Sequence, residues 1–247
     1  MNALGVSLAQ LEDRMAKACR AASRPRTEVE LMAVSKTFPA EAILEAASLG
    51  LMLYGENRVQ EFAAKAVDAT AMRERATNPA LRFHLIGHLQ SNKALRAAEI
   101  FDAIDSVDSL KLAQRLNDAA AKLDKKLSIL IEVKLSPEES KAGLDPSSAA
   151  ATELLDALPS LTHLELRGLM TVAPLGVPDG ETRACFRSLG EWRGRWAQQH
   201  PRLSFNVLSM GMSGDFELAI AEGATRIRIG SALFGARFYA AASTETH

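Results

Sequence analysis

Eight apolar, strand-like runs alternate with amphipathic helical stretches, and this alternation limits the possible folds more than any other feature. The runs cover residues 31–36, 51–56, 82–87, 101–107, 127–135, 164–173, 202–211 and 225–235. Strand followed by helix, repeated in this way, predicts parallel strands joined by right-handed crossovers. A (β/α)8 TIM barrel takes about 250 residues, and this chain has 247. A doubly wound sheet often has a glycine-rich phosphate loop after its first strand, whereas "KTFP" stands here. We therefore predict an α/β barrel.

The helical stretches between the runs have recognisable beginnings and ends. Residues 40–50, 109–126 and 215–223 carry apolar side chains at helical spacing. The predicted N-caps are hydroxyl or carboxylate residues, Ser109 and either Ser213 or Asp215. The predicted C-caps are the glycines Gly50 and Gly223.

Both ends of the chain lie outside the repeating pattern. Residues 1–25 form an amphipathic stretch of mixed charge, which predicts an extra helix over the bottom or the flank of the barrel. Residues 240–247 are small and polar, and we expect a frayed tail there. Because no repeat, linker or low-complexity segment interrupts the chain, we predict a single domain over residues 1–247.

The composition argues against several classes of protein. A formal net charge of −1 offers no electrostatic attraction to nucleic acid or to an anionic membrane. Two cysteines are too few for a disulfide framework. The first 24 residues lack the apolar centre of a signal peptide, and no apolar run is long enough to span a bilayer. We therefore expect a soluble, cytoplasmic protein, and a monomer.

In barrels of this kind the active site lies at the carboxyl ends of the strands. The residues at the predicted ends supply amines, an arginine, hydroxyls and glycine amides, but no cluster of carboxylates. They are Lys36, Glu56, Asn57, His84, Asp105, Lys134, Met170, Thr171, Ser209, Arg228, Gly230 and Ser231.

Lys36 ends an apolar run, although lysine is seldom buried without a partner. A desolvated lysine has a lowered pKa, and its free amine attacks a carbonyl to form a Schiff base. The alternative is a structural lysine paired with a strand-end carboxylate such as Asp105. Position alone leaves both interpretations open.

The loops after the last two runs suit a phosphate group. Gly230 and Ser231 follow the alternating "TRIRI", where exposed backbone amides can hold an anion. The segment "SMGMSGD" (209–215) has two hydroxyls and two glycines before a predicted helix start. Each loop alone also fits an ordinary turn with an N-cap. Together they favour a phosphate site, because the loops after strands seven and eight are its usual place.

The histidines do not indicate a metal site. His84 and His88 are four residues apart but straddle Gly87, with no nearby cysteine or supporting carboxylate. We therefore predict that no metal is bound. Met170, in "GLMTV", is typical of a core residue, with contact to a bound ring as the alternative.

Six motifs resemble one known family. "AVSKTFP", "YGENRVQEF", "FHLIGHLQSNK", "GLMTV", "SMGMSGDFELAI" and "RIRIGSALFGAR" are similar to those of the YggS/PROSC family, the pyridoxal phosphate homeostasis proteins. The resemblance extends from residue 31 to residue 238. That family resembles the barrel domain of alanine racemase, fold type III of the pyridoxal phosphate (PLP) enzymes, without the second domain.

The resemblance implies a cofactor and a role for each matching residue. Lys36 would carry pyridoxal 5′-phosphate as a covalent aldimine, and Arg228 would face the pyridine nitrogen. The backbone amides of Gly230 and Ser231 and the hydroxyls of Ser209 and Ser213 would hold the phosphate. Asn57 and His84 would line the pocket, and Met170 remains a candidate for contact with the ring. Arg226 departs from the family, in which this position is often apolar or histidine, and it would need a partner inside the barrel.

The resemblance also implies a function without turnover. An arginine at the pyridine nitrogen keeps that nitrogen unprotonated, so the cofactor is a poorer electron sink. We therefore expect a binding protein for vitamin B6 homeostasis, not an enzyme, which supplies PLP to PLP-dependent apo-enzymes.

Two other functions stay open. The first is a small fold type III racemase or decarboxylase, which needs a second acid or base. In such enzymes this residue comes from another domain, and "ARFYAAASTETH" is too short to form one. Tyr54 and Tyr239 are the only tyrosines, and neither is an obvious replacement. The second is a barrel enzyme for a phosphorylated sugar, which forms no aldimine and so has no visible absorption band.

Overall fold

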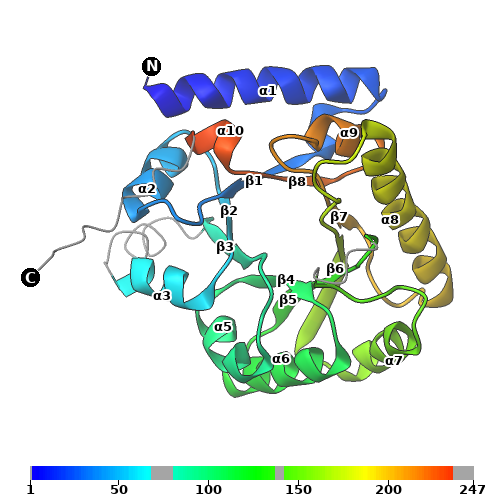
Figure 1. Ribbon diagram of the computed structural model, residues 1–247. Coiled ribbons are helices and arrows are strands. Elements are labelled where there is room, and N and C mark those ends of the chain that lie inside the picture. Colours follow the sequence, from blue (N-terminus) through cyan, green and yellow to red (C-terminus); the bar gives the residue numbers. More distant parts are fainter. Residues whose placement is uncertain (1, 68–79, 137–141, 236–247) are drawn as a thin grey trace, which may run out of the picture.

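The strands of the computed structural model close into a barrel, which confirms the predicted fold (Figure 1). The structure describes residues 2–67, 80–136 and 142–235. Parallel strands follow one another around the barrel in chain order, and β8 pairs with β1 to close it. The strands are β1 (Glu30–Val34), β2 (Leu53–Glu56), β3 (Arg82–Leu85), β4 (Ala103–Val107), β5 (Leu127–Glu132), β6 (Leu164–Met170), β7 (Val207–Ser209) and β8 (Arg226–Ile229).

Helices surround the barrel (Figure 1). They are α1 (Ala3–Ala21), α2 (Ala40–Ser48), α3 (Val59–Val67), α5 (Ala94–Ile100), α6 (Leu110–Lys122), α7 (Ala149–Ala157), α8 (Asp179–Gln199), α9 (Phe216–Ala221) and α10 (Ser231–Phe234), with 3-10 turns η1 (Arg26–Glu28), η2 (Ser91–Lys93) and η3 (Leu158–Ser160). Among the described residues, no helix is long and apolar enough to cross a membrane.

The predicted helix caps are largely confirmed. The Ser109 hydroxyl accepts a hydrogen bond from the backbone N–H of Leu112 at the start of α6. Gly50 and Gly223 follow α2 and α9 with φ angles of +90° and +96°, which glycine adopts without strain. Asp215 occupies the N-cap position of α9, but its carboxylate accepts a hydrogen bond from the preceding loop and makes no capping bond.

Two predicted runs are more than twice as long as the strands they contain. The run 202–211 contains only the short β7. The run 225–235 ends as a strand at Ile229, and the next residues form α10, in which the N–H groups of Leu233 and Phe234 donate to the carbonyl of Gly230. A short apolar run does not distinguish strand from helix by its pattern, and here the local hydrogen bonds decide.

The predicted extra helix, α1, covers a flank of the barrel. It packs against α9 and α10, and Leu11, Met15 and Cys19 on its inner face are buried. Figure 1 shows α1 running past α10 and α9, outside β1 and β8. Because α10 after β8 is a single helical turn, α1 supplies the outer layer that a longer last helix supplies in a regular barrel.

Candidate functional site

Lys36 lies in a tight turn directly after β1. The N–H of Phe38 donates to the carbonyl of Ser35 at 3.1 Å and closes this turn around Lys36. Thr37 has a φ of +67°, which is strained for a β-branched residue and persists only where the surroundings enforce it. The carboxylate of Glu61 accepts a hydrogen bond from the Thr37 N–H and helps to hold this conformation.

A buried ion pair supports the turn from behind. Lys65 on α3 donates to the carbonyl of Ser35 at 2.8 Å and to Oε1 of Glu56 at 2.9 Å. The Ser35 hydroxyl donates to the same Glu56 oxygen at 2.8 Å. Burial raises the pKa of Glu56, although Lys65 and Ser35 oppose the shift. These contacts fix the backbone that carries Lys36.

A cavity of about 210 Å³ opens beside Lys36 at the carboxyl end of the barrel. We call it the lysine cavity. Four motifs that are distant in the sequence meet in its wall, at Val34, Lys36, Phe38, Ile86, Met212, Ser213, Gly214, Arg228, Gly230, Ser231 and Gly235. The structure therefore brings together five of the predicted site residues, which are Lys36, Ser213, Arg228, Gly230 and Ser231.

Arg228 lines this cavity and is held by three hydrogen bonds. Its Nη1 donates to the carbonyl and to the hydroxyl of Ser209 at 2.6 and 3.0 Å, and its Nη2 donates to the carbonyl of Thr171 at 2.8 Å. Burial lowers the pKa of the Arg228 guanidinium. Ser209 was predicted to hold a phosphate, but its hydroxyl binds Arg228 and it does not line the lysine cavity.

The loops after β7 and β8 meet at one corner of the lysine cavity. The N–H of Ala232 donates to the hydroxyl of Ser213 at 3.3 Å and joins the two loops. The first N–H groups of a helical turn have no acceptor within it, which suits this corner to an anion. A Cβ at Gly230 would lie 3.4 Å from the carbonyl of Val34, an ordinary van der Waals contact, so the backbone here has room beside it.

A second cavity, of about 250 Å³, adjoins the first, and Ile86 lines both. We call it the glutamate cavity; its other lining residues are Asn57, Gly87, His88, Glu132, Val133, Lys134, Leu135, Ser136, Ala142 and Val172. Asn57 therefore lies beside the lysine cavity and not within it. A Cβ at Gly87 would lie 2.2 Å from the Asn57 carbonyl, so only glycine permits this packing.

Glu132 is a site residue that sequence reasoning missed. It ends β5 and is 8% exposed, and its Oε2 has no hydrogen-bond partner among the described residues. Burial, reinforced by the carboxylate of Asp108, raises the pKa of Glu132 to about 7, although Arg228 and His88 oppose the shift. The available signal was a lone carboxylate in the apolar run "LSILIEVKL".

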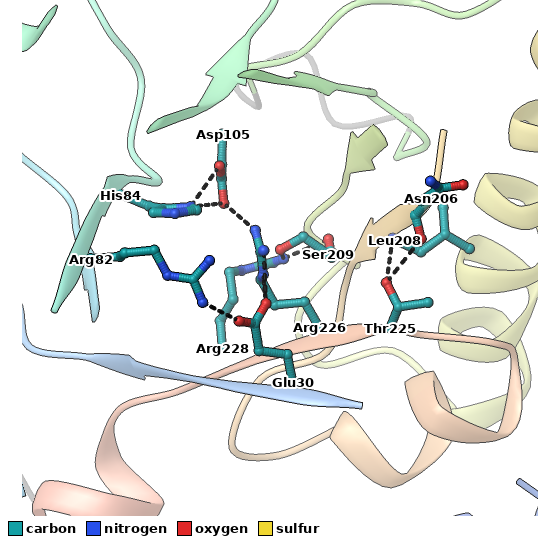
Figure 2. A network of polar contacts seen from close by, with 10 residues as sticks. All are labelled: Glu30, Arg82, His84, Asp105, Asn206, Leu208, Ser209, Thr225, Arg226 and Arg228. Atoms are coloured by element: carbon teal, nitrogen blue, oxygen red, sulfur yellow. Dashed lines mark hydrogen bonds and ion pairs between the residues drawn. The ribbon is translucent and has the colours of Figure 1, made fainter. Parts of the chain in front are cut away.

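The structure corrects the prediction for His84. Its Nδ1 lies 3.0 Å from Oδ1 of Asp105, and Oδ2 of Asp105 accepts a hydrogen bond from Arg226 at 3.3 Å (Figure 2). Arg226 also donates to Glu30, which pairs with Arg82. Because three of these residues begin strands, this amino-terminal network lies at the opposite end of the barrel from Lys36. His84 therefore lines neither cavity at the carboxyl end.

The amino-terminal network also answers two other questions. It provides the partners that Arg226 needs, Glu30 and Asp105. Burial raises the pKa of Asp105, but His84, Arg226 and Arg228 outweigh it and hold that pKa below its usual value. Asp105 is thus paired within the network, at the opposite end of the barrel from Lys36.

The remaining candidates lie outside both cavities. Met170 is fully buried at the end of β6 and lines neither cavity. The hydroxyl of Tyr54 lies within hydrogen-bonding distance of the carbonyls of Ile43 and Leu51, so it is occupied by backbone. Tyr239 lies outside the described residues.

The comparisons with known proteins agree with this geometry. The family described as "Alanine racemase, N-terminal domain" matches residues 6–238. The pyridoxal phosphate homeostasis protein of Vibrio cholerae is 43% identical over 94% of this chain and 93% of its own length. This chain belongs to the pyridoxal phosphate homeostasis protein family. The structure of the family member PipY of Synechococcus elongatus with PLP bound is 43% identical, has a TM-score of 0.77, and covers 94% of this chain and 100% of PipY.

The family barrel is also that of alanine racemase. The Clostridium difficile alanine racemase has a TM-score of 0.69 at 16% identity, so it is similar in fold alone. The match covers 96% of this chain but only 57% of the racemase. The family resemblance indicated by the six motifs is confirmed.

Proposed function

We propose that this protein binds pyridoxal 5′-phosphate, holds it as an aldimine on Lys36 and supplies it to PLP-dependent apo-enzymes without turnover of its own. The observation that carries the proposal is the lysine cavity, in which an amine, a fixed guanidinium and a hydroxyl–glycine corner surround one space. Bound PLP would supply an aldehyde, with which primary amines condense.

The residues of the lysine cavity fit the three polar parts of PLP. Lys36 supplies the amine for the aldehyde. Ser213, Gly230 and Ser231 supply the corner for the phosphate, at the start of a helical turn. Arg228 supplies a guanidinium for the pyridine nitrogen, and its bonds to Ser209 and Thr171 fix its orientation before a ligand enters. Similarity to PipY, whose structure has PLP bound, supports the same ligand here.

Arg228 also supports storage rather than turnover. Arginine keeps its proton, so it does not protonate the pyridine nitrogen and the bound ring withdraws electrons poorly. Weak electron withdrawal slows loss of the Cα proton from any bound amino acid. A carrier benefits from this low reactivity, because the cofactor reaches its recipient unaltered.

The test of this proposal is to map the lysine that holds PLP. Borohydride reduction followed by peptide mapping should add the phosphopyridoxyl mass to the peptide that contains Lys36. Lys36→Ala should abolish the aldimine absorption band, while Lys17→Ala on the exposed face of α1 should keep it. The mass on Lys65, on Lys134 or on no lysine would show that the assignment is wrong.

The supply function has its own measurement. The loaded protein releases some PLP by simple dissociation, and this sets the concentration of free PLP used as the control. The loaded protein should activate an apo-transaminase faster than this control does. Equal rates would mean that the protein only binds PLP and does not deliver it.

One observation favours the alternative of a small PLP-dependent racemase. Glu132, beside the lysine cavity, has a carboxyl pKa of about 7 and is suited to proton transfer. Incubation with L-alanine in heavy water separates the two functions. We expect Cα deuteration no faster than with free PLP, and rapid deuteration with loss of chirality would establish the enzyme instead.

A further inference from the structure

The glutamate cavity combines apolar walls with one buried carboxylate. Ile86, Val133, Leu135 and Val172 supply aliphatic surface. Glu132 stands among them with an oxygen that has no hydrogen-bond partner within the described part of the chain. An unpartnered buried polar group is costly, and in a native structure it often marks the place of a missing ligand.

The charged groups around Glu132 come from several elements. Asp108 follows β4 and adds a second negative charge. His88 follows β3 and pairs with Asp108 at 3.3 Å, and Lys134 lines the cavity two residues after Glu132. Arg228 of the lysine cavity also acts on Glu132, so the two cavities are electrostatically linked.

We propose that the glutamate cavity is a subsite for an alkyl primary amine, such as a lysine side chain, whose ammonium group binds the Glu132 carboxylate and transfers a proton to it. The bound pair rests as ammonium and carboxylate, and the transfer occurs as the amine attacks. It breaks one N–H bond of the ammonium and forms one O–H bond on Glu132, leaving a neutral amine and a neutral carboxyl. No oxidant or other reactant is needed. The inference rests on the proposed function, because the neutral amine would then compete with Lys36 for the cofactor.

Three features of the cavity fit this ligand. Its aliphatic walls match an alkyl chain, and its carboxylate matches an ammonium group. It shares Ile86 with the lysine cavity, so an amine held here lies beside the space assigned to the cofactor aldehyde. A carboxyl whose pKa is about 7 can accept a proton near neutral pH and return it to the departing lysine.

The first experiment uses the protein without cofactor. Glutamate labelled with ¹³C at its carboxyl carbon gives a Glu132 signal, which is assigned by its loss in Glu132→Gln. Butylammonium chloride should lower the pH at which this signal titrates by about one unit, because a nearby cation favours the carboxylate. Butanol or sodium chloride at equal concentration should leave it unchanged. No response to butylammonium, or an equal response to the controls, would overturn the proposal.

The second experiment uses the protein loaded with PLP. Added butylamine should displace Lys36 from the cofactor about a hundredfold more slowly in Glu132→Gln, because the general base is lost. The affinity for PLP should stay within about twofold. Glu165→Gln is the matched control, because Glu165 is an exposed carboxylate near the amino end of β6. This variant should exchange at the wild-type rate. Equal exchange rates in all three proteins would overturn the proposal.

These outcomes separate the inference from the proposed function. If Lys36 did not hold PLP, borohydride would leave Lys36 unmodified and no bond to Lys36 could be displaced, yet the butylammonium titration would still report on the glutamate cavity. If the subsite were wrong, borohydride reduction would still modify Lys36, but the titration of the Glu132 signal would not respond to butylammonium.

Discussion

A single carboxylate, Glu132, links proton binding to the stability of this barrel. Folding raises its pKa from 4.5 to about 7, so between these values the folded chain binds more protons than the unfolded chain. The free energy of unfolding therefore falls as the pH rises, and the loss is complete above about pH 7. At 1.36 kcal/mol for each pKa unit, the ionised Glu132 lowers the free energy of unfolding by about 3 kcal/mol at alkaline pH.

Glu132→Gln should remove this pH dependence, because the amide stays neutral. Urea unfolding of the cofactor-free protein at pH 5 and pH 8.5 is the measurement. Between pH 5 and pH 8.5 the free energy of unfolding of the variant, measured relative to that of wild type, should rise by about 2–3 kcal/mol. Glu165→Gln, half-exposed on β6, should follow the wild-type curve. Parallel curves for Glu132→Gln and wild type would show that Glu132 is ionised throughout.

Ser213 offers a second test at the scale of one residue. If its hydroxyl binds the phosphate, Ser213→Ala loses one charge-assisted hydrogen bond, which is worth about 1.5–3 kcal/mol or ten- to a hundredfold in affinity. The affinity for pyridoxal, which has no phosphate, should hardly change. Fluorescence titration with both ligands gives the comparison. Equal losses would place the phosphate elsewhere.

The residues of the site were only partly predictable from the sequence. Lys36 and Gly230 were found because barrels place their chemistry at strand ends, and the structure joins them in one cavity. His84 was assigned to the wrong end of the barrel, and Glu132 was not predicted at all. Whether a side chain near a strand end turns to one end of the barrel or the other depends on contacts between strands. His84 is held by Asp105, a contact between strands that no local pattern reveals.

At the scale of elements, the pairing of β6 depends on a glycine. The register between β5 and β6 shifts so that Leu166 pairs with Ile129 and Gly168 pairs with Leu130. Gly168 has a φ of +154°, and a Cβ there would lie 1.9 Å from the carbonyl of Val207 on β7. Gly168→Ala should therefore push two strands apart and cost about 3 kcal/mol or more.

A helical glycine provides the matched control for Gly168. Gly194 lies on the exposed side of α8, and nothing stands within 4 Å of a Cβ added there. Gly194→Ala should stabilise the protein by about 0.5–1 kcal/mol, since alanine favours a helix. Thermal unfolding of both variants should therefore show shifts of opposite sign. A small effect of Gly168→Ala would mean that β6 and β7 adjust without cost.

The elements were predictable in number and order, but their limits were not. Apolar runs and helical periodicity located all eight strands, because strand and helix have different periods. The run 225–235 was predicted as one strand, yet α10 begins at Ser231. Local hydrogen bonds to the carbonyl of Gly230 end the strand there, and apolar composition does not encode them.

At the scale of the whole molecule, the two polar ends of the barrel differ in how they are satisfied. The amino-terminal network pairs Arg226 with Glu30 and Asp105, and Asp105 with His84 (Figure 2). At the carboxyl end Glu132 keeps an oxygen without a partner in the described chain. A buried polar group left unpaired is expected at a functional site, whereas the pairing at the opposite end of the barrel stabilises the fold.

The last prediction concerns the stability of the whole barrel when PLP binds. A ligand at a hundred times its dissociation constant adds about 2.7 kcal/mol to the free energy of unfolding. For a chain of this size that raises the melting temperature by about 5–10 °C. The bond to Lys36 contributes only through the aldehyde. PLP should therefore raise the melting temperature of Lys36→Ala less than that of wild type. The variant should keep the share of the stabilisation that comes from contacts with the phosphate and the ring.

Deoxypyridoxine phosphate, which has no aldehyde, is the ligand that isolates the contribution of Lys36. It should raise the melting temperature of wild type and of Lys36→Ala equally, because both keep Arg228 and the Ser213 corner. PLP should exceed it in wild type alone, by the stabilisation that the covalent bond adds. If PLP and deoxypyridoxine phosphate stabilised wild type to the same extent, Lys36 would make no bond to the aldehyde, and the turn after β1 would serve only to shape the cavity.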